Sequence, residues 1–211
     1  QSMRTATWYF DFVSPFAYIC LHRLKELPSD LSIEYRPVLF AGLLNHWGQK
    51  GPAELPTKRR YTYRWSHWWA RGLGIPLRYP AAHPFNPLHH LRLAIACGSK
   101  PETVRKIFDS IWTTGEDASD RGRFAVLCEE LRVTADALAA PEVKDTLRKN
   151  TEAAAQRGVF GVPTFEVDGE FFWGADSIEF LCAFLANPST VRNEEMRRLD
   201  ELPTGAARKG S

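Results

Sequence analysis

The sequence has no Cys-x-x-Cys pair, and its four cysteines are widely separated, at Cys20, Cys97, Cys128 and Cys182. This spacing excludes a dithiol redox motif and a cysteine-based zinc site. The sequence also lacks a run of about 20 apolar residues, which a membrane-spanning helix requires. It has no basic start followed by an apolar stretch, which a secretory signal requires. We therefore expect reduced, mostly buried thiols in a cytoplasmic protein that does not bind a membrane.

An excess of charge of one sign is also lacking. Lys and Arg together number 27 and Asp and Glu 25, for a net charge of +2. This balance gives no reason to expect nucleic acid as a partner, although Thr57–Arg64 forms a local basic run. The six histidines include no His-x-x-x-His pair, and the adjacent His89 and His90 would point in different directions on a helix. We therefore predict no metal site.

The sequence does contain a strand–helix–strand pattern near its start. Thr5–Val13 is rich in aromatic and β-branched residues, which predicts a strand. Ser14 and Pro15 then have the pattern of a helix N-cap followed by proline at the first helical position, so we expect a helix to about Leu27. Leu31–Val38 alternates apolar and polar residues, which predicts a second strand. A helix joins the two strands, so they should be parallel.

Residues 41–157 have mostly helical patterns, with an extended connection over Gly74–Asn86. The expected helices are Pro56–Leu73, Pro87–Cys97, Pro101–Thr114, Arg121–Arg132 and Pro141–Arg157. Pro163–Gly174 then predicts a β-hairpin, because Asp168-Gly169 lies between two apolar runs. Asp176 is expected to cap a last helix, Ser177–Leu185.

This order of elements predicts an α/β, thioredoxin-like fold with a large all-helical insertion. Residues 3–40 and 158–188 would form the discontinuous thioredoxin-like domain, and residues 41–157 the helical insertion domain. Residues 189–211 would form a C-terminal tail with one amphipathic helix and a mobile end.

Three motifs, FDFVSPFAY, FGVPTF and FFWGADSIEFL, resemble the DsbA-like superfamily. Within it they are most similar to the kappa-class glutathione transferase branch, and there to the bacterial 2-hydroxychromene-2-carboxylate isomerases. The oxidoreductase relatives begin their first helix with Cys-x-x-Cys, whereas this chain has Ser14-Pro15-Phe16-Ala17. A dithiol cycle needs an attacking thiolate and a resolving sulfur, and neither is present in that turn. Cys20 lies further along the helix and is expected to be a buried packing residue.

The resemblance implies glutathione as cofactor and assigns residues to it. Ser14 would donate a hydrogen bond to the glutathione thiolate as the catalytic residue, at the positive end of its helix. Val162 would pair with the cysteinyl backbone beside a cis Val162–Pro163 bond. Asp176 and Ser177 would hold the γ-glutamyl end. The plain alternative for Ser14 and Asp176 is that each only caps its own helix.

Two residues of the insertion complete the implied site. Lys58 matches a lysine near the glycine carboxylate of glutathione, and Asn86 resembles an asparagine near the cleft. The plain alternatives are a solvated lysine and a helix cap before Pro87. Relatives often have an Asp and an Arg after the tyrosine that follows Lys58, whereas this chain has tryptophans. These tryptophans would pack the insertion on the core, or they would form the wall of an aromatic pocket together with other rings of the chain. The tryptophans are Trp65, Trp68 and Trp69, and the other rings are Trp47, Phe85 and Trp112.

These observations leave three alternative functions open. The first is a glutathione-dependent cis–trans isomerase that interconverts 2-hydroxychromene-2-carboxylate and trans-o-hydroxybenzylidenepyruvate, with the glutathione thiolate as a recycled nucleophile. The second is a kappa-like glutathione transferase that conjugates electrophiles. The third is a non-catalytic thioredoxin-like binding module. The resemblance also implies a small aromatic or electrophilic substrate and a homodimer.

Overall fold

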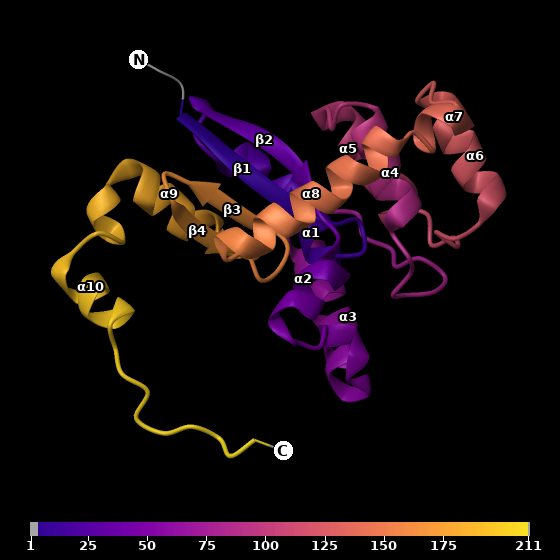
Figure 1. Cartoon of the computed structure of the whole chain (residues 1–211). Coiled ribbons are helices and arrows are strands. Elements are labelled where there is room, and N and C mark those ends of the chain that lie inside the picture. The colour runs from indigo at the N-terminus through magenta and orange to yellow at the C-terminus, as the bar shows by residue number, and fades with distance from the viewer. Residues whose placement is uncertain (1–3, 211) are drawn as a thin grey trace.

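The computed structural model describes residues 4–210, and its centre is a four-stranded mixed sheet with the order β2-β1-β3-β4 (Figure 1). β1 (Arg4–Phe10) pairs parallel with β2 (Leu31–Pro37) and antiparallel with β3 (Thr164–Val167), which pairs antiparallel with β4 (Glu170–Trp173). The predicted thioredoxin-like fold is confirmed. The predicted end residues 3 and 211 lie outside the described part of the chain.

The βαβ unit forms as its sequence predicts. α1 (Pro15–Arg23) starts with proline after the N-cap Ser14 and continues into a 3₁₀ turn at Leu24–Glu26. β1 is shorter than predicted and ends at Phe10 rather than Val13. The reason is Asp11, whose carboxylate accepts hydrogen bonds from the N–H of Val13 and of Phe40 and so turns the backbone away from the sheet.

The helices between β2 and β3 include all five that were predicted and two that were not. Their bounds are α2 Phe40–Trp47, α3 Pro56–Gly72, α4 Leu88–Ala96, α5 Pro101–Trp112, α6 Arg121–Glu130, α7 Ala135–Leu138 and α8 Pro141–Arg157, with a 3₁₀ turn at Pro52–Glu54. α2 and the single turn α7 were not expected from the sequence. In Figure 1, α3 projects from the body on one side of the sheet, and α6 and α7 lie furthest from it.

Helices cover both faces of the sheet. Ala6, Trp8 and Phe10 of β1 belong to the large core cluster, together with buried side chains of α1, α5 and α9 (Ile178–Ala186). Tyr9 faces the opposite way and packs with Leu43 of α2 and with the end of α8. The insertion is therefore packed directly on the sheet, and the domain boundaries at residues 40/41 and 157/158 stay a prediction.

The hairpin and the C-terminal region have one correction. Asp168 and Gly169 both have positive φ, 51° and 79°, which confirms the predicted two-residue turn. Asp176, however, does not cap α9, because the N-cap is Ser177 and its side chain makes no capping bond. The Ser177 hydroxyl instead donates to the Gly174 carbonyl at 2.7 Å. After α9, the chain has a 3₁₀ turn at Pro188–Thr190 and α10 (Glu194–Asp200), the helix expected in the tail.

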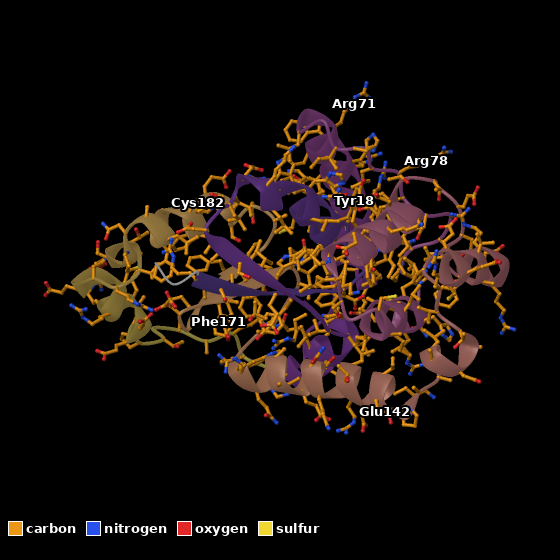
Figure 2. All side chains as sticks on the ribbon, turned by 90° about the horizontal axis from the view of Figure 1, so that it is seen from above. Tyr18, Arg71, Arg78, Glu142, Phe171 and Cys182 are labelled. Carbon is orange, nitrogen blue, oxygen red and sulfur yellow. The ribbon has the colours of Figure 1, made fainter. Side chains whose placement is uncertain are left out.

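Side-chain packing separates a dense interior from a charged periphery (Figure 2). Tyr18 lies within the interior and is fully buried, and its hydroxyl donates to the Pro76 carbonyl. Arg71, Arg78 and Glu142 point outward from the insertion. No helix among residues 4–210 is long and apolar enough to cross a membrane.

Candidate functional site

The candidate site is a cavity of about 840 Å³ at the end of the sheet where β1 meets α1. Four parts of the chain form it: the turn around Ser14, one side of α2 and α3 with the loop between them, the segment 83–87, and the segments on either side of β3 and β4. Five predicted residues line this cavity, and they are Ser14, Lys58, Val162, Pro163 and Asp176. Residues more than 150 positions apart in the sequence therefore meet at one place.

Ser14 lies at the N-terminus of α1 and is 7% exposed. Its Oγ accepts a hydrogen bond from the Ala17 N–H at 3.1 Å, so Ser14 is the N-cap that the sequence predicted. Accepting this bond leaves the hydroxyl hydrogen free to donate. The free N–H groups and the dipole of α1 favour a negative charge at the same point. Capping and a role toward an anion are therefore compatible.

The Val162–Pro163 peptide is cis, as predicted, and Val162 lines the same cavity as the start of α1. Within residues 4–210, neither the N–H nor the C=O of Val162 has a hydrogen-bond partner. Pro163 is tied to the hairpin, because its carbonyl accepts the Gly174 N–H at 2.8 Å. A side chain at Gly161 would collide with the Trp173 indole. Val162 therefore offers an unpaired backbone N–H and C=O to the cavity, and the contacts of Gly161 and Pro163 fix the backbone on either side of it.

Asp176 and Ser177 have different positions relative to the cavity. Asp176 lines it, and its carboxylate folds back over Gly174, whose φ is 99° and where a Cβ would lie 2.5 Å from Asp176 Oδ1. Ser177 is buried and outside the lining, and it braces the turn through its bond to the Gly174 carbonyl. The turn thus presents one carboxylate to the cavity, on a backbone that Ser177 fixes.

The two predicted insertion residues also differ. Lys58 is exposed, lies in the first turn of α3 and brings a cation to the cavity wall. Asn86 is exposed and outside the lining, while its neighbours Phe85 and Pro87 are part of it. The Asn86 Oδ1 accepts the Leu88 N–H at 3.1 Å, so it stabilises the backbone that leads into α4. The structure therefore brings Lys58, but not Asn86, to the other predicted residues.

Aromatic rings form one wall of the cavity. Phe16 of α1 contacts Trp65 of α3 with centroids 5.7 Å apart, and Trp65 contacts Trp69 at 4.9 Å. Trp65, Trp69 and Phe85 line the cavity. The other rings considered for this wall lie elsewhere: Trp68 is 69% exposed, Trp112 is fully buried, and Trp47 is 44% exposed and donates to the Val159 carbonyl. The wall suits a flat aromatic ligand.

Asp11, which lies three residues before Ser14, is a cavity residue that was not predicted from the sequence. Its carboxyl is fully buried, lines the cavity and accepts two backbone hydrogen bonds, from Phe40 at 2.8 Å and Val13 at 3.2 Å. Burial away from water raises the pKa of Asp11 to about 7, against the lowering effect of the backbone N–H groups. The only sequence signal was an aspartate after a buried strand.

A polar network formed by Arg59, Tyr63 and His83 was also missed. Tyr63 and His83 line the cavity, and the Tyr63 hydroxyl lies 2.6 Å from His83 Nδ1. Arg59 Nε donates to that hydroxyl at 2.9 Å, and His83 Nε2 lies 2.7 Å from the Val13 carbonyl oxygen. His83 is 20 positions from Tyr63 and lies on an extended segment rather than on α3, so no local pattern could have revealed this contact.

The cysteines are not part of the cavity lining. Cys20 is fully buried, as predicted, and burial raises the pKa of its thiol to about 12, which keeps it protonated and unreactive. All four cysteines are free. In the part of the chain that the structure describes, no three His, Cys, Asp or Glu side chains form a group able to hold a metal ion.

Comparison with known proteins agrees with this fold. The family model of the DSBA-like thioredoxin domain matches residues 5–186. The chain is 31% identical over 191 residues to a 2-hydroxychromene-2-carboxylate isomerase of Sphingobium xenophagum, covering 86% of this chain and 98% of the relative. It is 26% identical over 205 residues to human glutathione S-transferase kappa 1, covering 86% and 91%. A solved structure of 2-hydroxychromene-2-carboxylate isomerase superposes with a TM-score of 0.75 at 26% identity, over 95% of this chain and all of that chain.

Proposed function

We propose, from the premise that the chain belongs to the DSBA-like thioredoxin domain family, that it is a glutathione-dependent isomerase. The chain is an enzyme of the branch that contains isomerases and kappa-class glutathione transferases. The proposed reaction interconverts 2-hydroxychromene-2-carboxylate and trans-o-hydroxybenzylidenepyruvate. The observation that carries the proposal is Ser14, a hydroxyl at the start of α1 on the wall of the cavity, where a disulfide enzyme needs a thiol.

The residues around Ser14 fit glutathione by their chemistry. Val162 offers an unpaired N–H and C=O, which suit the backbone of a bound peptide. Asp176 offers a carboxylate for the γ-glutamyl ammonium, and Lys58 a cation for a carboxylate at the other end. When bound, glutathione would supply a thiolate, a nucleophile able to convert a conjugated double bond reversibly into a single bond that can rotate. Ser14 and the dipole of α1 stabilise that negative charge.

The aromatic wall would hold the second substrate. Phe16, Trp65 and Trp69 present rings tilted against one another, which a planar bicyclic molecule can cover. Lys50, like Lys58, lies on the cavity lining, so one cation is available for the substrate carboxylate while the other pairs with glutathione. These residues exclude water from one side of the substrate and orient it toward the start of α1.

A turnover assay with a count of free thiol tests this proposal. Purified protein is incubated with 2-hydroxychromene-2-carboxylate, with and without glutathione, and the ultraviolet spectrum and the total free thiol are followed together. An isomerase gives the spectral change only with glutathione and leaves the thiol count constant. Loss of thiol in step with the spectral change would instead assign the kappa-type transferase reaction. No glutathione binding at millimolar concentration by calorimetry would overturn both functions.

The assembly and location are proposed on the same family premise. We propose a homodimer in the cytoplasm. Light scattering at several protein concentrations tests the dimer, and a monomer mass at all of them would refute it. Fractionation of the native host tests the location.

A further inference from the structure

Arg59, Tyr63, His83 and the Val13 carbonyl form one continuous polar chain along the cavity. Arg59 Nε donates to the Tyr63 hydroxyl at 2.9 Å, and the Arg59 guanidinium also donates to the His83 carbonyl at 2.8 Å. The Tyr63 hydroxyl reaches His83 Nδ1 at 2.6 Å, and His83 Nε2 reaches the Val13 carbonyl at 2.7 Å. The far end of this chain is the residue just before Ser14.

These contacts fix the position of each hydrogen. The Val13 carbonyl can only accept, so the hydrogen of the neutral imidazole is on Nε2. His83 Nδ1 then carries a lone pair, and the Tyr63 hydroxyl donates its hydrogen to it. The same hydroxyl also lies within donating distance of the His83 carbonyl oxygen, at 2.8 Å, and that oxygen accepts from the Arg59 guanidinium as well. The shorter 2.6 Å approach to the Nδ1 lone pair requires the Tyr63 hydrogen between those two atoms. Because its own hydrogen points at His83, the Tyr63 oxygen faces its other neighbours only as an acceptor, and the basic Nδ1 of His83 lies behind it.

The protonation state of His83 depends on the charged and titratable groups around it. Arg59 and Tyr63 contact it from α3, and the Tyr79 ring lies 5.5 Å away. Lys58 and Asp11 lie on the same cavity lining. Burial lowers the pKa of His83, the hydrogen bond to Val13 raises it, and Arg59 lowers it. The imidazole is therefore neutral at neutral pH, and a new negative charge nearby would favour its protonated form.

We propose that Tyr63 and His83 together accept the proton that a thiol loses in the cavity. This inference rests on the proposed function, because the thiol is that of glutathione. Tyr63 takes the thiol proton on its oxygen while its own proton passes to His83 Nδ1. The S–H bond breaks, its electron pair stays on sulfur, and an N–H bond forms. A thiol and a neutral imidazole become a thiolate and an imidazolium, whose other N–H remains bonded to the Val13 carbonyl.

His83→Gln separates this role from a structural one. A glutamine amide nitrogen can replace Nε2 and keep the bond to the Val13 carbonyl, but it has no basic nitrogen for a proton. Tyr63→Phe breaks the link from the cavity to His83. The matched controls are His89→Gln and Tyr61→Phe, because both residues are exposed and outside the cavity lining.

The readouts are the thiolate absorbance of bound glutathione against pH and the net protons released on binding. Calorimetry in two buffers of different ionisation enthalpy gives the second quantity. Wild type and both controls should form thiolate at neutral pH without net proton release, since His83 keeps the proton. His83→Gln and Tyr63→Phe should raise the apparent thiol pKa by about one unit, a tenfold smaller thiolate-to-thiol ratio.

Two results would overturn the inference while leaving the proposed function intact. One is a full thiolate signal in His83→Gln, which would make the network purely structural. The other is release of one proton per thiolate formed by wild type, which would mean that water takes the proton. Absence of glutathione binding by wild type would overturn the proposed function, and this inference with it.

Discussion

Replacing Asp11 with asparagine should change how the stability of the protein depends on pH. The Asp11 carboxyl is fully buried and its pKa is raised from 3.8 to about 7 by loss of water. A carboxyl in the unfolded chain ionises near its ordinary value, so between pH 4 and pH 7 the unfolded state loses this proton while the folded state keeps it. The free energy of unfolding therefore falls as the pH rises through this window.

The size of this effect follows from the shift. One pKa unit corresponds to 1.36 kcal/mol, and a shift of about three units gives a loss of about 4 kcal/mol between pH 4 and pH 7. The Asp11→Asn variant would carry no such pH dependence. The introduced amide can accept only one of the two N–H groups of Val13 and Phe40, which costs about 1–3 kcal/mol at every pH. The variant should be less stable than wild type at pH 4 and equal or more stable at pH 8.

Urea unfolding at pH values from 4 to 8 measures both the pH dependence of the stability and the cost of the substitution at each pH. The difference between variant and wild type is the informative quantity, because it cancels every other titrating group. Asp136→Asn is the matched control, because Asp136 is exposed on the short helix α7. Its curve should run parallel to that of wild type. A parallel curve for Asp11→Asn as well would refute the reasoning, because the buried carboxyl would then ionise as it does in the unfolded chain.

Three further predictions concern residues that are proposed to contact glutathione or the substrate. Ser14→Ala should cost about 0.5–2 kcal/mol of stability through the lost cap on Ala17, and it should weaken the thiolate absorbance of bound glutathione more than its affinity. Unchanged absorbance would leave Ser14 with capping alone. Asp176→Ala should weaken glutathione binding about 10- to 150-fold in calorimetry, the effect of losing a charge-assisted bond of about 1.5–3 kcal/mol, whereas an unchanged affinity would place the γ-glutamyl end elsewhere. Trp65→Ala should raise the KM for an aromatic substrate roughly tenfold, from about 1.5 kcal/mol of lost ring contact, and leave glutathione affinity unchanged; an unmoved KM would mean that the substrate lies on another wall.

Elements whose signals are local were predictable from the sequence. Ser14-Pro15 caps α1, Asp168-Gly169 forms the hairpin turn, and α8 has the predicted bounds Pro141–Arg157. In each case neighbouring residues supply the groups that the backbone needs. The turn at Gly174–Ser177 shows the limit of this reasoning. Two polar residues stood at a predicted helix start, and the structure makes Ser177 the N-cap and turns Asp176 toward the cavity.

Elements that depend on distant partners were not predictable. α2 begins at Phe40 after Leu39, which has no side chain able to cap a helix. Its first N–H groups are satisfied from elsewhere: Phe40 donates to Asp11, and Leu39 donates to Thr151 of α8 at 3.0 Å. These partners are 29 and 112 residues away. A helix start of this kind leaves no mark in its own sequence.

The same distinction divides the candidate site into two parts. The residues assigned to glutathione, such as Ser14, Val162 and Asp176, lie in turns next to strand or helix ends, where short sequence motifs identify them. The groups that would meet the second substrate, such as Trp65 and Trp69, reach the cavity only through the packing of α3. A resemblance carried by turn motifs therefore supports a cofactor more strongly than a substrate. Variants on α3 are the place to determine which substrate this enzyme takes.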